Sequence, residues 1–137
     1  GSPVEAVTVT PPRTGELLDR IGFICQMARG YCENYKPDTV GIEMPAMHQS
    51  AGGMMVARSG ALVKLAMLVG ALSRSLTPWD PELVPVAAWK GQLPKAVVTR
   101  RLTTWLQGRS TGPLWTVPKS HQWDALGIAV HKMGEKF

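Results

Sequence analysis

Residues 39–44, Thr-Val-Gly-Ile-Glu-Met, form the stretch that decides the fold. Side chains alternate between the two faces of an extended chain, so Ile42 lies on one face and Glu43 on the other. Pro45 comes soon after, and proline is rare inside a regular strand. The pattern therefore predicts a short strand with an acidic residue near its C-terminal end.

The segments on either side of this strand alternate between strand and helix patterns. Runs of β-branched or apolar residues bounded by prolines predict strands at residues 4–9 and 83–88, and a smaller strand or turn at 114–117. Apolar residues at helical spacing predict helices at residues 14–35, 56–76, 94–106 and 120–133. This order predicts an α/β domain in which helices cover a sheet.

Two finer features of the helices follow from the residue types. Thr14 and Ser120 are expected to cap the first and last helices, because a side-chain oxygen there accepts a bond from a free backbone N–H. The buried stripe of the long helix is expected to consist of Leu62, Leu65, Val69, Leu72 and Leu76.

The bulk composition sets the size and charge of the protein. A length of 137 residues fits a single domain, 1–137, and 45% hydrophobic residues are enough for a packed core. The net charge is +5 and the isoelectric point is about 9.6, which favours an anionic partner, nucleic acid first. A basic domain that binds no nucleic acid is the alternative interpretation.

Cysteine usage and hydropathy indicate the compartment. Cys25 and Cys32 are the only cysteines, and two thiols seven residues apart on a helix make neither a ready disulfide nor a zinc site. We expect both to be reduced and buried in an intracellular protein of the cytoplasm, nucleoid or organelle matrix. No apolar run approaches the roughly 20 residues that span a bilayer, and no signal peptide is expected.

Two carboxylates are candidates for chemistry because of where they lie. Glu43 comes at the C-terminal end of an apolar strand, where open α/β sheets bind their ligands. Asp124 lies in the first turn of the last helix, with His121 three residues earlier on the same face. The alternatives are a solvent-facing glutamate, an aspartate stabilised by the helix dipole and a capping histidine. Carboxylate oxygens are the ligands that Mg²⁺ prefers, and two such ions about 4 Å apart can hydrolyse a phosphodiester.

The motifs, taken in order, resemble a known family. They are Val-Gly-Ile-Glu-Met-Pro at residues 40–45, a helix with small residues around Gly60 and Gly70, Val-Pro-Val-Ala-Ala-Trp-Lys at 84–90, Lys95, and His-Gln-Trp-Asp-Ala-Leu-Gly-Ile-Ala at 121–129. This set is similar to the RuvC-type Holliday-junction resolvases, particularly bacteriophage-like members. The resemblance implies a ribonuclease-H-like mixed sheet flanked by helices.

The resemblance also implies roles for single residues. Glu43, Asp124 and His121 would be catalytic and would hold Mg²⁺, or Mn²⁺, while Lys90 and Lys95 would contact DNA near the scissile phosphate. The loop Met47, His48, Gln49 and Ser50 would probe the centre of the junction. The family acts as a homodimer, here expected to form through the long helix 56–76. It hydrolyses symmetric strands of a four-way junction and leaves 5′-phosphates.

Further DNA contacts are expected from basic residues near these motifs. Six phosphate contacts would give a salt slope of roughly −5, and solvated helix faces are the alternative interpretation. Among the tryptophans, Trp105 and Trp123 are expected in the core, while Trp79 and Trp115 either stack on bases or pack within loops. The additional basic candidates are Arg58, Arg100, Arg101 and Lys119.

One part of the family pattern has no counterpart in the sequence. The family begins with a strand that carries an Asp-x-Gly motif, and nothing before Val4 matches it. Either the natural protein is longer, or another chain completes the sheet, or catalysis is lost. The alternative functions are therefore a catalytically inactive RuvC-like scaffold that binds nucleic acid within a larger assembly, and a non-nuclease α/β protein.

Overall fold

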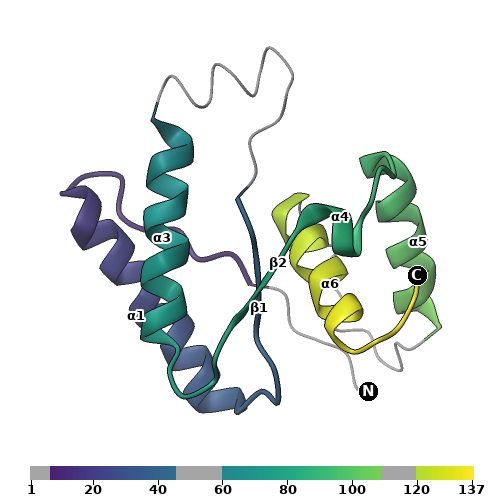
Figure 1. Cartoon of the computed structure of the whole chain (residues 1–137), viewed down its shortest axis with the longest axis horizontal. Coiled ribbons are helices and arrows are strands. Elements are labelled where there is room, and N and C mark those ends of the chain that lie inside the picture. Colours follow the sequence, from purple (N-terminus) through teal and green to yellow (C-terminus); the bar gives the residue numbers. More distant parts are fainter. Residues whose placement is uncertain (1–6, 46–59, 109–119) are drawn as a thin grey trace. The chain divides into compact units, whose positions relative to one another are not determined.

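The computed structural model describes residues 7–45, 60–108 and 120–137 (Figure 1). The chain divides into two compact units, one formed by Val9–Pro85 and the other by Gly1–Thr8 together with Val86–Phe137. We call them the strand unit and the helical unit. That residues 1–137 form a single domain stays a prediction.

The strand unit is built around two parallel strands, β1 (Gly41–Glu43) and β2 (Glu82–Val84). Ile42 pairs with Leu83, and the backbone N–H of Met44 extends the ladder by donating to the Val84 carbonyl over 2.9 Å. Parallel strands need a long crossover connection, and this one contains the helix α3 (Ala61–Ser75). The predicted α/β class is confirmed at this level: helices combine with a parallel sheet.

Two helices of the strand unit, α1 (Leu17–Tyr35) and α3, pack against each other (Figure 1). The contact is apolar because each helix has a buried stripe at helical spacing. Its buried members are Ile21, Cys25 and Cys32 on α1, Val69 on α3, and Leu76 just after α3.

An arginine joins α1 to the end of α3. One terminal nitrogen of Arg29 donates to the carbonyls of Ser75, over 2.6 Å, and of Thr77, over 2.9 Å. The last carbonyls of a helix have no partner within it and lie at the negative end of the helix dipole. The guanidinium therefore closes the C-terminal end of α3, and it also lies 5.8 Å from the ring centroid of Trp79.

The first helix ends as predicted but starts differently. Its last residue is Tyr35, and Lys36 adopts a left-handed conformation whose N–H donates to the Cys32 carbonyl over 2.8 Å. The prediction that Thr14 caps the helix is wrong, because the N-cap is Glu16 and no side chain caps it. Glu16 takes the extended backbone conformation that an N-cap requires, and Gly15 before it has a φ of 121°.

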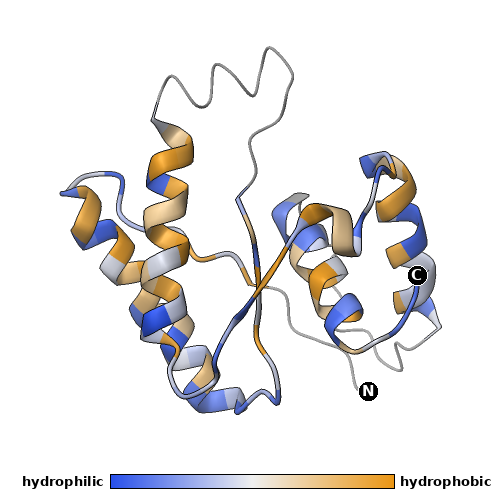
Figure 2. Ribbon diagram, viewed as in Figure 1, coloured by the Kyte–Doolittle hydropathy of each residue, from blue (hydrophilic) through white to orange (hydrophobic). Residues whose placement is uncertain are grey.

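The stripe predicted for the long helix is only partly correct. Val69 and Leu76 are buried, whereas Leu65 is 47% exposed, and Val63 and Met67 are exposed as well. Figure 2 shows that α3 is apolar along most of its length, so more apolar surface exists on α3 than α1 covers. The described part of the helix begins after Gly60, and residues 56–59 lie outside the described ranges.

The helical unit contains α4 (Val86–Trp89), α5 (Lys95–Gln107) and α6 (Ser120–Lys132). The helices α4 and α5 both pack against α6. The prediction of a strand over residues 83–88 is therefore wrong in its second half. Pro85 separates the end of β2 from a helical turn, and that turn brings Trp89 into the core.

The core of the helical unit carries the predicted tryptophans. Trp105 and Trp123 are buried, which confirms the prediction for both. They share the core with Trp89, Val98, Leu102, Leu106, Leu126, Ile128 and Val130.

The structure also bears on the strands predicted at residues 4–9 and 114–117, on the two cysteines and on membrane-spanning helices. Residues 7–9 form no strand, and residues 4–6 and 114–117 lie outside the described ranges. Cys25 and Cys32 are free thiols, as predicted. No helix in the described parts of the chain has both the length and the apolarity needed to cross a membrane.

Candidate functional site

Asp124 is positioned by the packing of α6. Its neighbours Trp123 and Leu126 are buried against the rest of the helical unit, which fixes the rotation of the helix. Asp124 lies at the margin of that buried face, and its side chain is 30% exposed. A partly exposed carboxylate on a fixed helix can reach a ligand in solvent while its backbone stays rigid.

Lys95 is brought to Asp124 by the start of α5. Pro94 is the N-cap of this helix and Lys95 is its first residue. The Lys95 amine lies 4.0 Å from a carboxylate oxygen of Asp124, and the two side chains are 52% and 30% exposed. An exposed pair at this distance adds at most about 1 kcal/mol to stability. The pair therefore contributes little to the fold, but it places a cation beside a carboxylate.

The two helices run in the same direction. Lys95 and Asp124 meet near their N-terminal ends, and the indole N–H of Trp105 donates to Glu135, just after α6, over 2.7 Å. Figure 1 shows the same parallel course. Both helix N-termini thus lie on one side of the helical unit, where their partial positive charges favour anions.

His121 lies one turn before Asp124 in α6 and is exposed. Residues three apart share a face of a helix, so His121 and Asp124 lie on the same face of α6, as the sequence predicts. The side chain of His121 makes no hydrogen bond or ion pair with any described residue. Gln122 beside it donates to the hydroxyl of Thr8 over 2.9 Å.

Glu43 lies at the C-terminal end of β1, as the sequence predicts. It pairs with Val84 across the parallel ladder, and its side chain is half-buried. The C-terminal edge of a parallel sheet is where ligands of α/β proteins bind. Glu43 belongs to the strand unit and Asp124 to the helical unit, so their convergence on one metal site stays a prediction. Within the described residues there is no group of three or more acidic, histidine or cysteine side chains that could hold a metal ion.

The predicted nucleic-acid contacts fall into three groups. Lys90 is half-buried at the end of α4, and its backbone N–H donates to Val86 over 2.9 Å. Arg100 and Arg101 are exposed on α5. The third group lies outside the described residues and consists of Met47, His48, Gln49, Ser50, Arg58 and Lys119.

Sequence reasoning missed Lys136 and Phe137. Both line a pocket together with Arg100 and Arg101. They lie about 35 residues further along the chain, so neither helical periodicity nor any motif signals the contact. Only the parallel packing of α5 and α6 brings the segment after α6 to α5.

The burial of Cys32 has a chemical consequence. Burial raises the pKa of the Cys32 thiol, and the nearby positive charge of Arg29 opposes that shift only in part. A raised pKa keeps the sulfur protonated, and a protonated thiol is a poor nucleophile and a poor metal ligand. Cys32 is therefore a core residue of the strand unit.

Comparison of the chain with models of known protein families gave no match, and comparison with curated proteins gave none.

Proposed function

We propose that the protein is a metal-dependent endonuclease of the RuvC type, with a ribonuclease-H-like fold, that hydrolyses four-way or branched DNA. The observation that carries the proposal is the pair formed by Lys95 and Asp124. It joins one residue to which the family resemblance gives a metal-binding role, Asp124, to one to which it gives a phosphate contact, Lys95.

The chemistry of this pair suits phosphodiester hydrolysis. The carboxylate of Asp124 is a hard oxygen donor, partly exposed and held on a fixed helix, and such oxygens fit Mg²⁺ or Mn²⁺. Bound metal ions would activate water and stabilise the leaving oxygen. The amine of Lys95, within 4.0 Å of the carboxylate, would neutralise the charge of a phosphate held at the same place.

Glu43 and His121 have supporting roles in the proposal. Glu43 supplies a second carboxylate at the C-terminal edge of the parallel sheet. Its place in the proposal rests on its position at the end of β1. His121, exposed one turn before Asp124, would carry a proton or bind an outer ligand. The net charge of +5 suits a polyanionic substrate.

The test is cleavage of a synthetic four-way junction by protein expressed from its full natural reading frame. We expect cleavage that needs Mg²⁺ or Mn²⁺ and that stops with a chelator. Asp124→Asn and Glu43→Gln should each lower the rate by roughly 100-fold or more, because metal ions contribute several kcal/mol to such reactions. The control is Asp38→Asn, which removes an exposed carboxylate outside the proposed machinery.

The same experiment distinguishes the nuclease from the alternative function, an inactive scaffold that binds nucleic acid. Tight binding of the junction without cleavage in either metal would support the inactive scaffold instead. Cleavage that survives Asp124→Asn would contradict the assignment of this residue, and equal losses in Asp124→Asn and Asp38→Asn would show a general effect of charge.

A further inference from the structure

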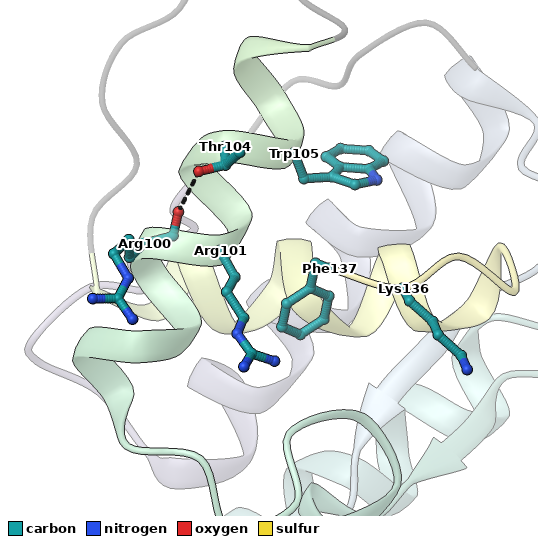
Figure 3. Close-up of a pocket in the computed structure, with 6 residues that line it drawn as sticks. All are labelled: Arg100, Arg101, Thr104, Trp105, Lys136 and Phe137. Atoms are coloured by element: carbon teal, nitrogen blue, oxygen red, sulfur yellow. Dashed lines mark hydrogen bonds between the residues drawn. The ribbon is translucent and has the colours of Figure 1, made fainter.

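A pocket in the helical unit combines three cationic side chains with two aromatic rings (Figure 3). Its volume is about 420 Å³, within the range of roughly 300–1,000 Å³ typical of small-ligand sites. We call it the α5 pocket. Its lining residues are Arg100, Arg101, Thr104 and Trp105 of α5, with Lys136 and Phe137 from the segment after α6.

The helix α5 presents its cations because its opposite face is buried. Val98, Leu102 and Leu106 anchor that face in the core, so Arg100 and Arg101 point outward. The hydroxyl of Thr104 donates to the Arg100 carbonyl over 3.2 Å, shown as the dashed line in Figure 3. The floor of the pocket is therefore a regular, anchored helix.

The other wall depends on a turn after α6. Gly134 has a φ of 73°, a conformation that favours glycine, and its N–H donates to the His131 carbonyl over 2.9 Å. Glu135 follows and accepts the indole N–H of Trp105 over 2.7 Å. This bond holds the segment against α5, which places Lys136 and Phe137 at the pocket.

The α5 pocket carries an excess of positive charge: three cationic side chains line it, and one carboxylate, that of Glu135, lies beside it on the indole of Trp105. Arg100, Arg101 and Lys136 form no ion pair with any described residue, and no acidic residue lines the pocket. Like charges held together repel, and an anion between them removes that repulsion. Arginine is the side chain best suited to phosphate, since its planar guanidinium donates two parallel hydrogen bonds.

We propose that the α5 pocket binds one nucleotide unit of single-stranded nucleic acid. Arg100, Arg101 and Lys136 would contact the phosphate, and the half-buried ring of Phe137 would stack on the base. A strand is favoured over a duplex because the base must leave its neighbours to reach an aromatic side chain. The inference rests on the proposed function and adds to it a contact with a single-stranded part of the branched substrate. Binding at this contact does not require cleavage.

Binding is measured with the full chain and no divalent metal, from the fluorescence anisotropy of a labelled oligothymidylate of about ten nucleotides, a length within ordinary single-strand site sizes. Phe137→Leu should weaken binding roughly 5- to 150-fold, the range for one stacked base, with an unchanged salt slope. The double variant Arg100→Gln/Arg101→Gln should reduce the salt slope by up to about 0.7, the value for one phosphate of a single strand that is no longer neutralised. Arg13→Gln/Arg74→Gln removes the same charge from exposed sites and is the matched control.

Several outcomes would overturn the inference. They are equal losses of affinity in the two arginine double variants, no effect of Phe137→Leu, and duplex DNA that competes as well as single strands do. Competition by thymidine monophosphate as strong as that of the oligonucleotide would assign the α5 pocket to a free nucleotide, and full competition by inorganic phosphate would assign it to a simple anion. Because no metal is present, a failure here leaves the test of Asp124 in cleavage intact, and the reverse also holds.

Discussion

Gly127 lies directly against the indole ring of Trp89. A methyl group at Gly127 would overlap ring atoms Cζ3 and Cε3 of Trp89, the latter at 2.6 Å. Both residues belong to the motifs that carry the family resemblance, Trp-Lys at residues 89–90 and Asp-Ala-Leu-Gly at residues 124–127. The structure gives these two residues a packing role, because α4 reaches α6 only where a glycine leaves room for the indole.

Gly127→Ala should destabilise the protein, because the overlap it creates should cost about 1–3 kcal/mol, the usual cost of overpacking a core. Trp89 is only 7% exposed, so its ring has little space into which it can move. The opposing gain from replacing a helical glycine with alanine is about 1 kcal/mol, which the overlap should exceed. Urea unfolding of the two proteins measures the difference.

The matched control for this prediction is Gly70→Ala in α3, where an added methyl group meets nothing within 4 Å. It should be neutral or should stabilise the protein by up to about 1 kcal/mol. Trp89→Phe in the Gly127→Ala background should recover part of the stability, because a smaller ring relieves the overlap. The packing argument fails if Gly127→Ala and Gly70→Ala have the same effect.

Local patterns in the sequence were enough to place most helices and the parallel strands. The apolar spacing of α5 and α6 predicted both helices to within about one residue, and Pro45 marked the end of the first strand. The pattern at residues 86–89 was ambiguous because Val-Ala-Ala-Trp suits either a strand or a helical turn. The contact of Trp89 with Gly127, 38 residues away, favours the helical turn. No local pattern in the sequence indicates this contact.

The candidate site was predictable only residue by residue. The position of Glu43 at a strand end and of Asp124 in a helix follows from short motifs, and the structure confirms both. The finer prediction that Asp124 lies in the first turn of α6 is wrong, because the first turn of this helix contains no acidic residue. The distance between Lys95 and Asp124 and the meeting of Phe137 with Arg101 arise from the way α5 packs on α6. Such contacts depend on tertiary packing, which periodicity within one helix does not encode.

Arg29→Lys should lower the stability of the protein by about 1 kcal/mol. A charged hydrogen bond contributes roughly 1.5–3 kcal/mol, and this value is reduced because Arg29 is exposed to water. Lysine keeps the charge, but its one nitrogen replaces two: the terminal nitrogen of Arg29 that donates to the Ser75 and Thr77 carbonyls, and the Nε that donates to Glu33. Glu33→Gln, which removes only the exposed ion pair of Arg29, should cost less than about 0.5 kcal/mol. Equal destabilisation by the two substitutions in thermal or urea unfolding would contradict the role given to the carbonyls.

The buried thiol of Cys32 should make stability depend on pH in the alkaline range. Its folded-state pKa is raised from the ordinary value of 9.0, so the unfolded chain releases this proton first as the pH rises. The unfolded state then binds fewer protons, and stability falls once the pH exceeds about 9. Cys32→Ala should be less stable at neutral pH because it packs less well, but the decline from pH 8 to 10, measured by urea unfolding, should be shallower. Parallel declines in the two proteins would contradict the assignment to Cys32.

Lys95→Gln should strengthen metal binding and weaken catalysis at the same time, if Asp124 holds metal as proposed. The Lys95 amine, 4.0 Å from the Asp124 carboxylate, competes with a bound cation, and exposed pairs of this kind contribute roughly 0.2–1 kcal/mol. The Mn²⁺ concentration for half-maximal binding should therefore fall about 1.5- to 5-fold, while cleavage at saturating Mn²⁺ slows because glutamine cannot neutralise the phosphate. Lys64→Gln, on the exposed face of α3, should change neither quantity. Unchanged Mn²⁺ affinity in Lys95→Gln would contradict the proposal that Asp124 binds the metal.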